Sequence, residues 1–279
     1  MDQQSAVKAG VMGWPIAHSK SPVVHTYWLS KYNIAGSYER LEVAPDDLSS
    51  SLKELAENGF IGVNLTVPHK ERALEFMDEV LEPAKKIGAV NTVFVSKSGK
   101  LTGTNTDAYG FMENLRLGAP GYSATSGPAA VLGAGGAARA ICVALLDAGV
   151  PNIRLINRTR DKAQALEAHL GGKIEVCNWD DKEKAASDAT LLVNTTTLGM
   201  TGQPSLAFDI SSLTENCTVN DIVYAPLETE LLANAKARGL KCVDGLGMLL
   251  FQAQPGFEKW FGYKPEVTEE LRRHVLSAP

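Results

Sequence analysis

The sequence predicts an α/β protein built from two successive series of strands and helices. Over the first hundred residues, short β-branched or aliphatic runs alternate with helix-like runs that carry helix-start and helix-stop residues. A second series begins near residue 129, after a stretch rich in Gly, Pro, Ser and Ala (117–129) that is the expected boundary loop. Such alternation is typical of mainly parallel sheets covered by helices. The length of 279 residues allows one large unit or two ordinary ones.

The first series begins with clear strand and helix signals. In chain order we expect a strand at 6–13, a helix at 21–33, a strand at 37–43, a helix at 46–59 and a strand at 60–67. Ser21 is expected to cap the first helix, with Pro22 at its first helical position. Gly59 is expected to close the second helix.

The segment "GVNLTVPHK" (62–70) combines a buried strand with an abrupt polar ending. Proline cannot continue a strand ladder, so the strand should end at Pro68. Lys70 would then lie at the mouth of the strand, near a core that penalises an unpaired ammonium. A lysine in that position calls for a partner or a function.

The remaining elements are predicted with simpler patterns. Residues 69–88 should be helical but broken at Pro83, and residues 89–107 should form a hairpin that turns at Ser98 and Gly99. The second series contains strand or helix signals at 129–149, 152–172, 173–179 and 189–196. The tail from Gly245 is expected to be helical, with its first helix ended or kinked at Pro255 and Gly256.

Composition excludes several classes of function. The net charge of −5 and the lack of a basic run argue against nucleic acid as a main partner. The apolar runs are too short for a membrane span, and "MDQQSAVKAGVMG" is not expected to be a secretory signal. Four widely separated cysteines suggest reduced thiols and, with the preceding points, a cytoplasmic protein. His18, His25 and His69 lack the spacing of a metal site, so packing or capping roles are expected and no metal is predicted.

A glycine-rich turn predicts nucleotide binding in the second series. In "AAVLGAGGAARA" a strand, a glycine turn and a helix start follow one another directly, and Gly133, Gly135 and Ala138 match the dinucleotide fingerprint. Phosphate would lie on the N–H groups at the helix N-terminus. The predicted phosphate-binding turn comprises Gly133, Ala134, Gly135, Gly136 and Ala137.

The end of the next strand favours NADP over NAD. An NAD site usually places Asp or Glu there to bind the ribose 2′-hydroxyl. This chain has Asn157, Arg158 and Thr159 instead, and an arginine suits a 2′-phosphate. Arg160 is either a second phosphate contact or a surface residue.

Motifs on both sides of the predicted boundary resemble those of the shikimate dehydrogenase family. They are "GWPIAHSKSPVVH" (13–25), "GVNLTVPHK" (62–70), "GAVNTV" (88–93), "GTNTDAYG" (103–110), "GAGGAA" (133–138), "NRT" (157–159), "NTTTLGM" (194–200), "DIVYAPLETELL" (221–232) and "DGLGMLLFQA" (244–253). The first four are far more specific than the glycine turn, and together the motifs span nearly the whole chain.

The resemblance implies two domains and a reaction. It implies an N-terminal α/β substrate domain (1–107), a Rossmann-like NADP-binding domain (108–244) and C-terminal helices (245–279) that return to the substrate domain. It also implies NADPH-dependent reduction of 3-dehydroshikimate to shikimate in the pathway to aromatic amino acids, in a cleft between the domains. The expected assembly is a monomer or homodimer.

Roles for individual residues follow from the same resemblance. Lys70 and Asp107 resemble the catalytic pair, and Ser19 and Ser21 resemble the pair that binds the substrate carboxylate. The other substrate-binding residues are expected to be Thr66, Asn91, Tyr224 and Gln252. Gly245 and Met248 complete the expected cofactor site. Neutral hydrogen-bonding side chains of this kind suit a small polyhydroxylated acid.

Two alternatives remain open from the sequence. One is a quinate or aminoshikimate dehydrogenase on the same scaffold. The other is a non-catalytic sensor of the metabolite or of NADP, which would be expected to lack the Lys–Asp pair.

Overall fold

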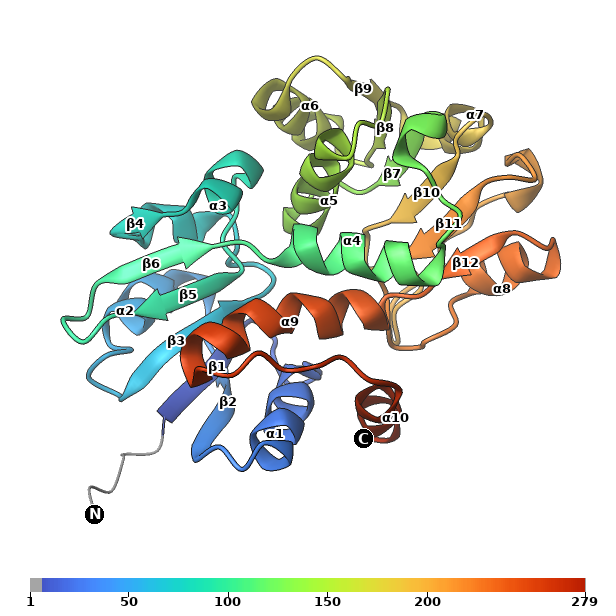
Figure 1. Ribbon diagram of the computed structural model, residues 1–279. Helices are drawn as coiled ribbons and strands as arrows, with labels where there is room; N and C mark the ends of the chain where they lie inside the picture. The colour runs from blue at the N-terminus through green and yellow to red at the C-terminus, as the bar shows by residue number, and fades with distance from the viewer. Residues whose placement is uncertain (1–6, 279) are drawn as a thin grey trace. The chain divides into compact units, whose positions relative to one another are not determined.

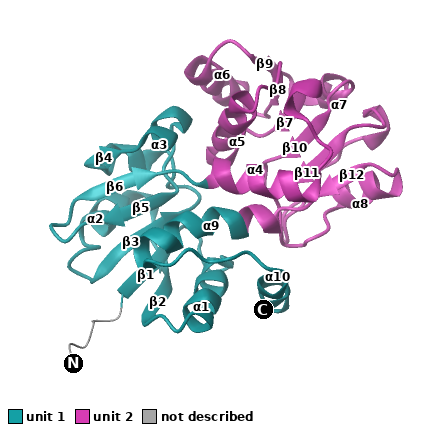
Figure 2. Ribbon diagram, in the orientation of Figure 1, with its two compact units in different colours: residues 1–106, 250–279 teal, residues 107–249 magenta. Residues whose placement is uncertain are grey.

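The computed structural model describes residues 7–278, and its chain forms two compact units (Figure 2). Unit 1 contains the described residues up to Thr106 together with those from Leu250 onward, and unit 2 is Asp107–Leu249. The predicted boundary loop at 117–129 therefore lies inside unit 2, where it connects a helix to a strand. No helix among residues 7–278 is long and apolar enough to cross a membrane.

Unit 1 is built on a mixed six-stranded sheet in the order β2-β1-β3-β5-β6-β4 (Figure 1). Its strands are β1 (Val7–Gly13), β2 (Gly36–Glu42), β3 (Phe60–Leu65), β4 (Glu79–Val80), β5 (Thr92–Val95) and β6 (Leu101–Thr104). β1 pairs in parallel with both β2 and β3, whereas β5 is antiparallel to β3 and β6. The predicted hairpin is confirmed, and Gly99 closes its turn by donating its N–H to Ser96 O at 2.9 Å.

The helices of unit 1 differ from the predictions at their ends. They are α1 (Ser21–Lys31), α2 (Leu48–Lys53), α3 (Glu82–Ile87), the larger part of α9 (Leu246–Phe261) and α10 (Glu269–Ser277). Ser21 is not the N-cap of α1, because Lys20 occupies that position. Ser21 is instead the first helical residue, and its N–H points to Ser19 Oγ at 3.3 Å.

The helix predicted at 46–59 is wrong in length. α2 ends at Lys53, and the chain then continues in tight turns, with Leu55 N–H bonded to Leu52 O and Gly59 N–H to Ala56 O. These bonds span three residues instead of the four of an α-helix. Leu48, Leu52 and Leu55 are all buried, so the apolar spacing looks helical although the backbone is not.

The single broken helix predicted at 69–88 is also wrong. A 3₁₀ turn (Arg72–Phe76) leads to β4, which pairs with β6, and Pro83 then lies in the first turn of α3 instead of interrupting a helix. Leu101 N–H donates to Asp78 Oδ2 at 2.7 Å, and Leu81 N–H donates to Gly103 O at 2.9 Å. These contacts with β6 draw the segment into the sheet, a tertiary effect that local spacing does not contain.

Unit 2 has a fully parallel six-stranded sheet in the order β12-β11-β10-β7-β8-β9. Its strands are β7 (Ala129–Leu132), β8 (Ile153–Ile156), β9 (Ile174–Cys177), β10 (Leu191–Asn194), β11 (Thr218–Asp221) and β12 (Lys241–Val243). Its helices are α4 (Asp107–Gly118), α5 (Gly136–Asp147), α6 (Arg160–Leu170), α7 (Lys182–Ala186), α8 (Glu230–Ala237) and the start of α9. The order reverses on either side of β7, which is the doubly wound arrangement of a dinucleotide-binding domain. The predicted Rossmann-like fold is confirmed.

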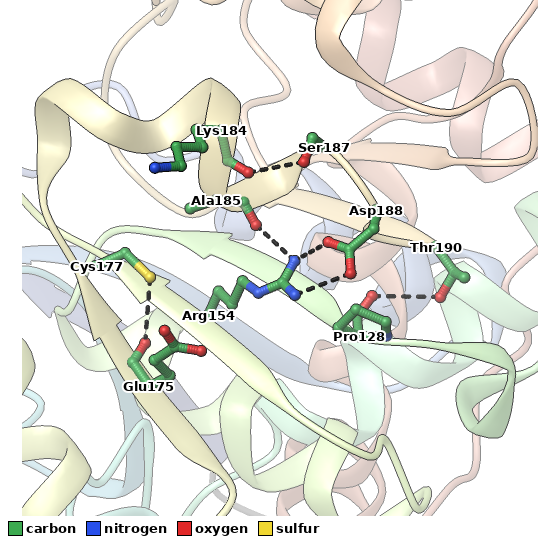
Figure 3. A network of polar contacts seen from close by, with 9 residues as sticks. All are labelled: Pro128, Arg154, Glu175, Cys177, Lys184, Ala185, Ser187, Asp188 and Thr190. Atoms are coloured by element: carbon green, nitrogen blue, oxygen red, sulfur yellow. Dashed lines mark hydrogen bonds and ion pairs between the residues drawn. The ribbon is translucent and has the colours of Figure 1, made fainter.

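An ion pair fastens the short helix α7 to this sheet (Figure 3). Arg154 projects from β8, and its guanidinium binds both carboxylate oxygens of Asp188, one of them at 3.0 Å. Nη1 also donates to Ala185 O at 2.8 Å. The arginine therefore satisfies a carbonyl at the end of α7, and it lowers the pKa of Asp188.

Helix α9 runs from Leu246 to Phe261 with Pro255 inside it. Of the two outcomes expected at Pro255, an end or a kink of the helix, the end is therefore wrong. Trp260, beyond the proline, donates its indole N–H to Val93 O at 3.3 Å and packs with Tyr38. Contact of the last turns with the sheet offsets the hydrogen bond that a proline removes.

His25 lies at the centre of an aromatic cluster in unit 1 and has a packing role. Its ring stacks on Tyr38 at 3.9 Å, and Trp28, Phe257 and Trp260 surround it. Complete burial lowers the pKa of His25 to about 3. Its imidazole is thus neutral in the folded protein over the range in which an exposed histidine becomes charged.

We expect this histidine to make the protein acid-sensitive. An unfolded chain protonates His25 near pH 6.5 but the folded chain does so only near pH 3, so stability is present above the first value and is lost as pH falls toward the second. The loss is about 2 kcal/mol at about pH 5. Urea unfolding at about pH 7 and about pH 5 should show this difference in the wild type and a smaller one in His25→Phe. Equal pH dependence in the two proteins would contradict the assignment.

Candidate active site

The turn after β3 holds Lys70 by its backbone. Thr66 N–H donates to Met12 O at 2.9 Å, and His69 N–H donates to Thr66 O at 2.9 Å. On the other side, Val90 N–H donates to Lys70 O at 2.7 Å. Lys70 is half-buried. These bonds hold the backbone of Lys70 in the turn that follows β3.

The side chain of His69 also holds this turn in place. It is buried, and its Nε2 lies 2.8 Å from Val43 O, which can only accept, so Nε2 carries the proton. Burial lowers the pKa of His69, which keeps the ring neutral. Like His25, this residue has a packing role, and within residues 7–278 there is no group of three potential metal-ligating side chains.

Asn91 and Gln252, which are 161 positions apart in the sequence, are in contact in unit 1. Asn91 directly precedes β5 and is buried, and Gln252 lies on α9. Asn91 Nδ2 donates to Gln252 Oε1 at 3.3 Å. Thr106 N–H donates to Asn91 Oδ1 at 2.9 Å. Two of the predicted substrate-binding amides thus share one location.

Ser19 and Ser21 lie together at the start of α1, where the N–H of Ser21 faces the hydroxyl of Ser19. Arg40, on the neighbouring β2, binds the carbonyl of Ser19 through Nε at 3.2 Å and Nη2 at 2.8 Å. Sequence reasoning missed this contact, because nothing in the strand pattern of β2 marks Arg40. The contact holds the loop that carries Ser19 and leads into α1, which begins at Ser21.

Asp107 and Tyr224 belong to unit 2. Asp107 is the first residue of α4, is 4% exposed, and follows Thr106 directly in the chain. Tyr224 is half-buried in the loop after β11. The predicted pairing of Lys70 with Asp107 would join residues of two units, and it remains a prediction.

Asp221 organises the loop that carries Tyr224, and sequence reasoning missed it. Its carboxylate accepts from Val223 N–H at 3.0 Å, Asn194 Nδ2 at 3.0 Å and Thr229 Oγ1 at 2.7 Å. Burial raises the pKa of Asp221 to about 6, against the effect of these three donors. Its signal in the sequence was its place as the first residue of the motif "DIVYAPLETELL" (221–232). One buried carboxyl group thus ties three segments together.

In the glycine turn, Gly133 and Gly135 are glycines for different reasons. Gly133 has φ of +110°, and a Cβ there would lie 2.4 Å from Thr195 Oγ1, so the protein itself requires glycine. A Cβ on Gly135, which precedes α5, would meet no atom within 4 Å. The protein does not need glycine at 135, but a phosphate approaching the helix N-terminus does. The turn therefore fits a dinucleotide.

The loop after β8 exposes Arg158 to solvent. Asn157 Nδ2 donates to Thr159 O at 2.7 Å, which shapes the loop, and Arg158 itself is exposed. Arg160 Nη1 binds Asn178 Oδ1 at 2.5 Å. Of the two candidate arginines, Arg160 therefore has a structural partner on a neighbouring loop, which favours Arg158 as the residue for a 2′-phosphate.

The start of α9 supplies the last two predicted cofactor positions. A Cβ on Gly245 would lie 2.1 Å from Ile222 O, so glycine is required for the close approach of the two backbones. The side chain of Met248 is buried in the apolar core of unit 2. Packing alone accounts for that side chain, and its contact with a cofactor remains a prediction.

Two family models and many known proteins match this chain. Residues 11–93 match the model of the shikimate dehydrogenase substrate binding domain, and residues 122–201 match that of shikimate / quinate 5-dehydrogenase. The chain is 56% identical to a shikimate dehydrogenase (NADP(+)) of Paramagnetospirillum magneticum, over 96% of this chain and 98% of the relative. It is 53% identical to the corresponding protein of Rhodospirillum rubrum, over 97% of each chain.

Solved structures share the fold over the same length. A shikimate 5-dehydrogenase of Thermus thermophilus in complex with NADP(H) and shikimate has a TM-score of 0.86 at 39% identity, over 97% of this chain and 98% of that one. A quinate dehydrogenase of Corynebacterium glutamicum with NAD has a TM-score of 0.90 at 32% identity, over 98% and 99%. The fold, the glycine turn and these relatives together show a two-domain, NADP-dependent oxidoreductase. The chain belongs to the shikimate dehydrogenase family.

The two glycines yield a direct test of the nucleotide site. We expect Gly135→Ala to keep the stability of the wild type within about 0.5 kcal/mol, because the added methyl group meets no protein atom. The same methyl group should obstruct the pyrophosphate and weaken NADPH binding at least about tenfold, measured by fluorescence titration. Gly172→Ala, also in open space, is the matched control and should bind NADPH normally. Unchanged NADPH affinity in Gly135→Ala would move the phosphate site elsewhere.

Proposed function

We propose that this protein is an NADP-dependent oxidoreductase that reduces 3-dehydroshikimate to shikimate, reversibly, in the pathway to chorismate and the aromatic amino acids. The observation that carries the proposal is the 56% identity, over nearly the whole of both chains, to a shikimate dehydrogenase (NADP(+)). The polar side chains of unit 1 and the open glycine turn of unit 2 support it, since one suits a hydroxylated acid and the other a dinucleotide.

Unit 1 would bind the substrate. Ser19 and Ser21, held together at the start of α1, would bind the carboxylate. Thr66, Asn91 and Gln252 would bind the ring hydroxyls, with Tyr224 contributing from unit 2. In unit 2 the nicotinamide part of the cofactor would lie near Gly245 and Met248, and Arg158 would bind the 2′-phosphate.

Lys70 and Asp107 would carry the proton chemistry. NADPH supplies the hydride that reduces the ketone. As the ketone oxygen gains negative charge, the ammonium of Lys70 stabilises it and donates a proton, and in the reverse direction Lys70 accepts that proton. Asp107 would orient the lysine and bind the substrate. The hydrogen-bonded turn at the backbone of Lys70 and its half-buried position favour this role over that of an exposed surface lysine.

The basic experiment follows the absorbance of NADPH after addition of 3-dehydroshikimate. We expect rapid oxidation with this pair and slow oxidation with NADH or with dehydroquinate. Binding of NADPH and shikimate without turnover would instead support the non-catalytic sensor.

Lys70→Ala tests the mechanism. We expect kcat to fall by about 10²–10⁴, since that is the usual contribution of general acid–base catalysis, with a smaller change in KM and an intact fold by circular dichroism. A kcat within a few fold of the wild type would show that the lysine is structural.

Asp107→Asn should also lower kcat, and the double variant should lose less than the two single losses combined, because the residues act as a unit.

Arg158→Ala tests the choice of cofactor. Loss of a charge-assisted contact should weaken NADPH by about 1.5–3 kcal/mol and leave NADH nearly unchanged. Arg160→Ala is the comparison, because that arginine already binds Asn178. If Arg158→Ala weakens both cofactors equally, the arginine has a structural role.

Quinate is the second candidate substrate, favoured by the TM-score of 0.90 to a quinate dehydrogenase. Quinate has one more hydroxyl, on the carbon that bears the carboxylate. The two serines that would bind this carboxylate are held close together, so the extra hydroxyl should be crowded. We expect kcat/KM for quinate to be far below that for shikimate, and comparable values would make quinate a physiological substrate.

Ser19→Ala should chiefly raise KM for shikimate, because the contact of Ser19 with the carboxylate is made in ground and transition states alike.

The cellular location belongs to the same proposal. All four cysteines carry free thiols. This agrees with the reducing cytoplasm, where the pathway would be expected.

A further inference from the structure

A continuous chain of hydrogen bonds crosses the interior of unit 1 and ends at the predicted substrate amides. The Tyr38 hydroxyl on β2 donates to Asn64 Oδ1 on β3 at 2.6 Å. Asn64 Nδ2 donates to Thr92 Oγ1 on β5 at 3.0 Å, and Thr92 Oγ1 donates to Asn91 Oδ1 at 2.8 Å. Asn91 Nδ2 then reaches Gln252 Oε1 at 3.3 Å. All five side chains are buried.

The hydrogen bonds of this series all run in one direction, from Tyr38 toward Gln252. Tyr38 and Asn64 determine that direction. Asn64 Nδ2 also donates to the backbone carbonyl of Asn91 at 3.1 Å, and because a carbonyl can only accept, the amide of Asn64 has one orientation. Its Oδ1 therefore faces Tyr38, which must donate. Burial raises the pKa of Tyr38 well above its usual value, so the hydroxyl keeps its proton.

Thr92 extends the same donor-to-acceptor direction to Asn91. Thr92 has a single hydroxyl proton, and since this oxygen accepts from Asn64, the proton is available for Asn91 Oδ1. The backbone N–H of Thr106 donates to the same oxygen. These two donors fix the orientation of the Asn91 amide, so that Nδ2 is the group that donates to Gln252 Oε1 and to Thr106 Oγ1.

The start of the chain is held by packing. The ring of Tyr38 lies flat on the neutral ring of His25, with centroids 3.9 Å apart and planes 3° apart. Asn64 and Thr92 are directly paired on neighbouring strands. The donors are therefore placed by the sheet and the aromatic cluster before any ligand binds.

We propose that Tyr38, Asn64 and Thr92 are positioning residues for substrate recognition, which set the orientation of the Asn91 amide and, through it, that of the Gln252 amide. This inference rests on the proposed function. With Oε1 turned toward Asn91, the N–H donors of Gln252 point away from Asn91. Such donors match the oxygen of a ring hydroxyl and repel an ammonium, which has donors only. The series of hydrogen bonds would thus select a polyhydroxylated acid over an analogue that has an amine in place of that hydroxyl.

Tyr38→Phe is the first test, because it removes one hydroxyl and keeps the stacked ring. Asn64 Oδ1 would lose its hydrogen-bond donor and become an unsatisfied buried acceptor, so we expect KM for shikimate to rise about 3- to 10-fold, the effect of one hydrogen bond. KM for NADP and kcat should change less than twofold. Calorimetric titration with shikimate should show the same weakening without turnover. Tyr32→Phe is the matched control, since its hydroxyl accepts one hydrogen bond in the same unit, from Glu266 N–H at 3.1 Å.

Thr92 provides the second test. Thr92→Val keeps the shape and removes the relay hydroxyl, so it should raise KM for shikimate like Tyr38→Phe, while Thr92→Ser should largely restore it. Tyr38→Phe added to Thr92→Val should have little further effect on KM, because the chain is already broken.

The outcomes separate this inference from the proposed function. If the wild type does not oxidise shikimate with NADP, the proposed function fails. If it does, and Tyr38→Phe and Thr92→Val leave KM unchanged at wild-type stability, only the positioning role fails. Equal increases in KM for shikimate and NADP, or the same increase in Tyr32→Phe, would show a general structural effect and also overturn the inference.

Discussion

The buried carboxamide of Asn91 is the interaction on which the arrangement of unit 1 depends. Its side chain and backbone receive donors from three elements, namely the hydroxyl of Thr92, the N–H of Thr106 and the amide of Asn64. Its own amine reaches α9. A buried amide left without such partners lowers the stability of the folded state by about 1–3 kcal/mol. The strands and helix α9 are therefore constrained to meet at this residue. The same contacts that stabilise the sheet also hold the predicted substrate amides.

Unit 2 uses a comparable device with a charged group. Asp221 is buried at the end of β11, and its three donors come from its own loop, from the end of β10 and from the start of α8. Asn194 also binds Leu198 O and the hydroxyl of Thr196, so the loop after β10 is shaped by the same centre. In both units, polar groups beyond the strand ends organise the loops that family resemblance associates with ligands. Loops held in this way are suited to preorganised binding, because little conformational entropy remains to be lost.

Much of the fold could be predicted from the sequence, and the errors share one cause. Most strands and the glycine turn were predicted because strand and fingerprint patterns are local, whereas no prediction covered β11, β12 or α8. The helix at 46–59 was predicted too long because Leu48, Leu52 and Leu55 keep helical spacing while the backbone changes to three-residue bonds. The strand at Glu79–Val80 was missed because its pairing with β6 is a tertiary contact. Pro255 was expected to end or kink its helix, and packing against the sheet continues that helix to Phe261.

The candidate site shows the same division between local and tertiary information. Residue types and motif order determined by themselves the family, the nucleotide turn and the set of candidate polar residues, because these depend on local sequence. The sequence did not indicate that Arg40 holds the serine loop, that Asp221 joins three segments, or that Tyr38 begins a chain leading to Gln252. Each of those facts is a distance between atoms far apart in the sequence. Only the tertiary structure decided them, because the direction of a hydrogen bond depends on which donors and acceptors the folded chain brings together.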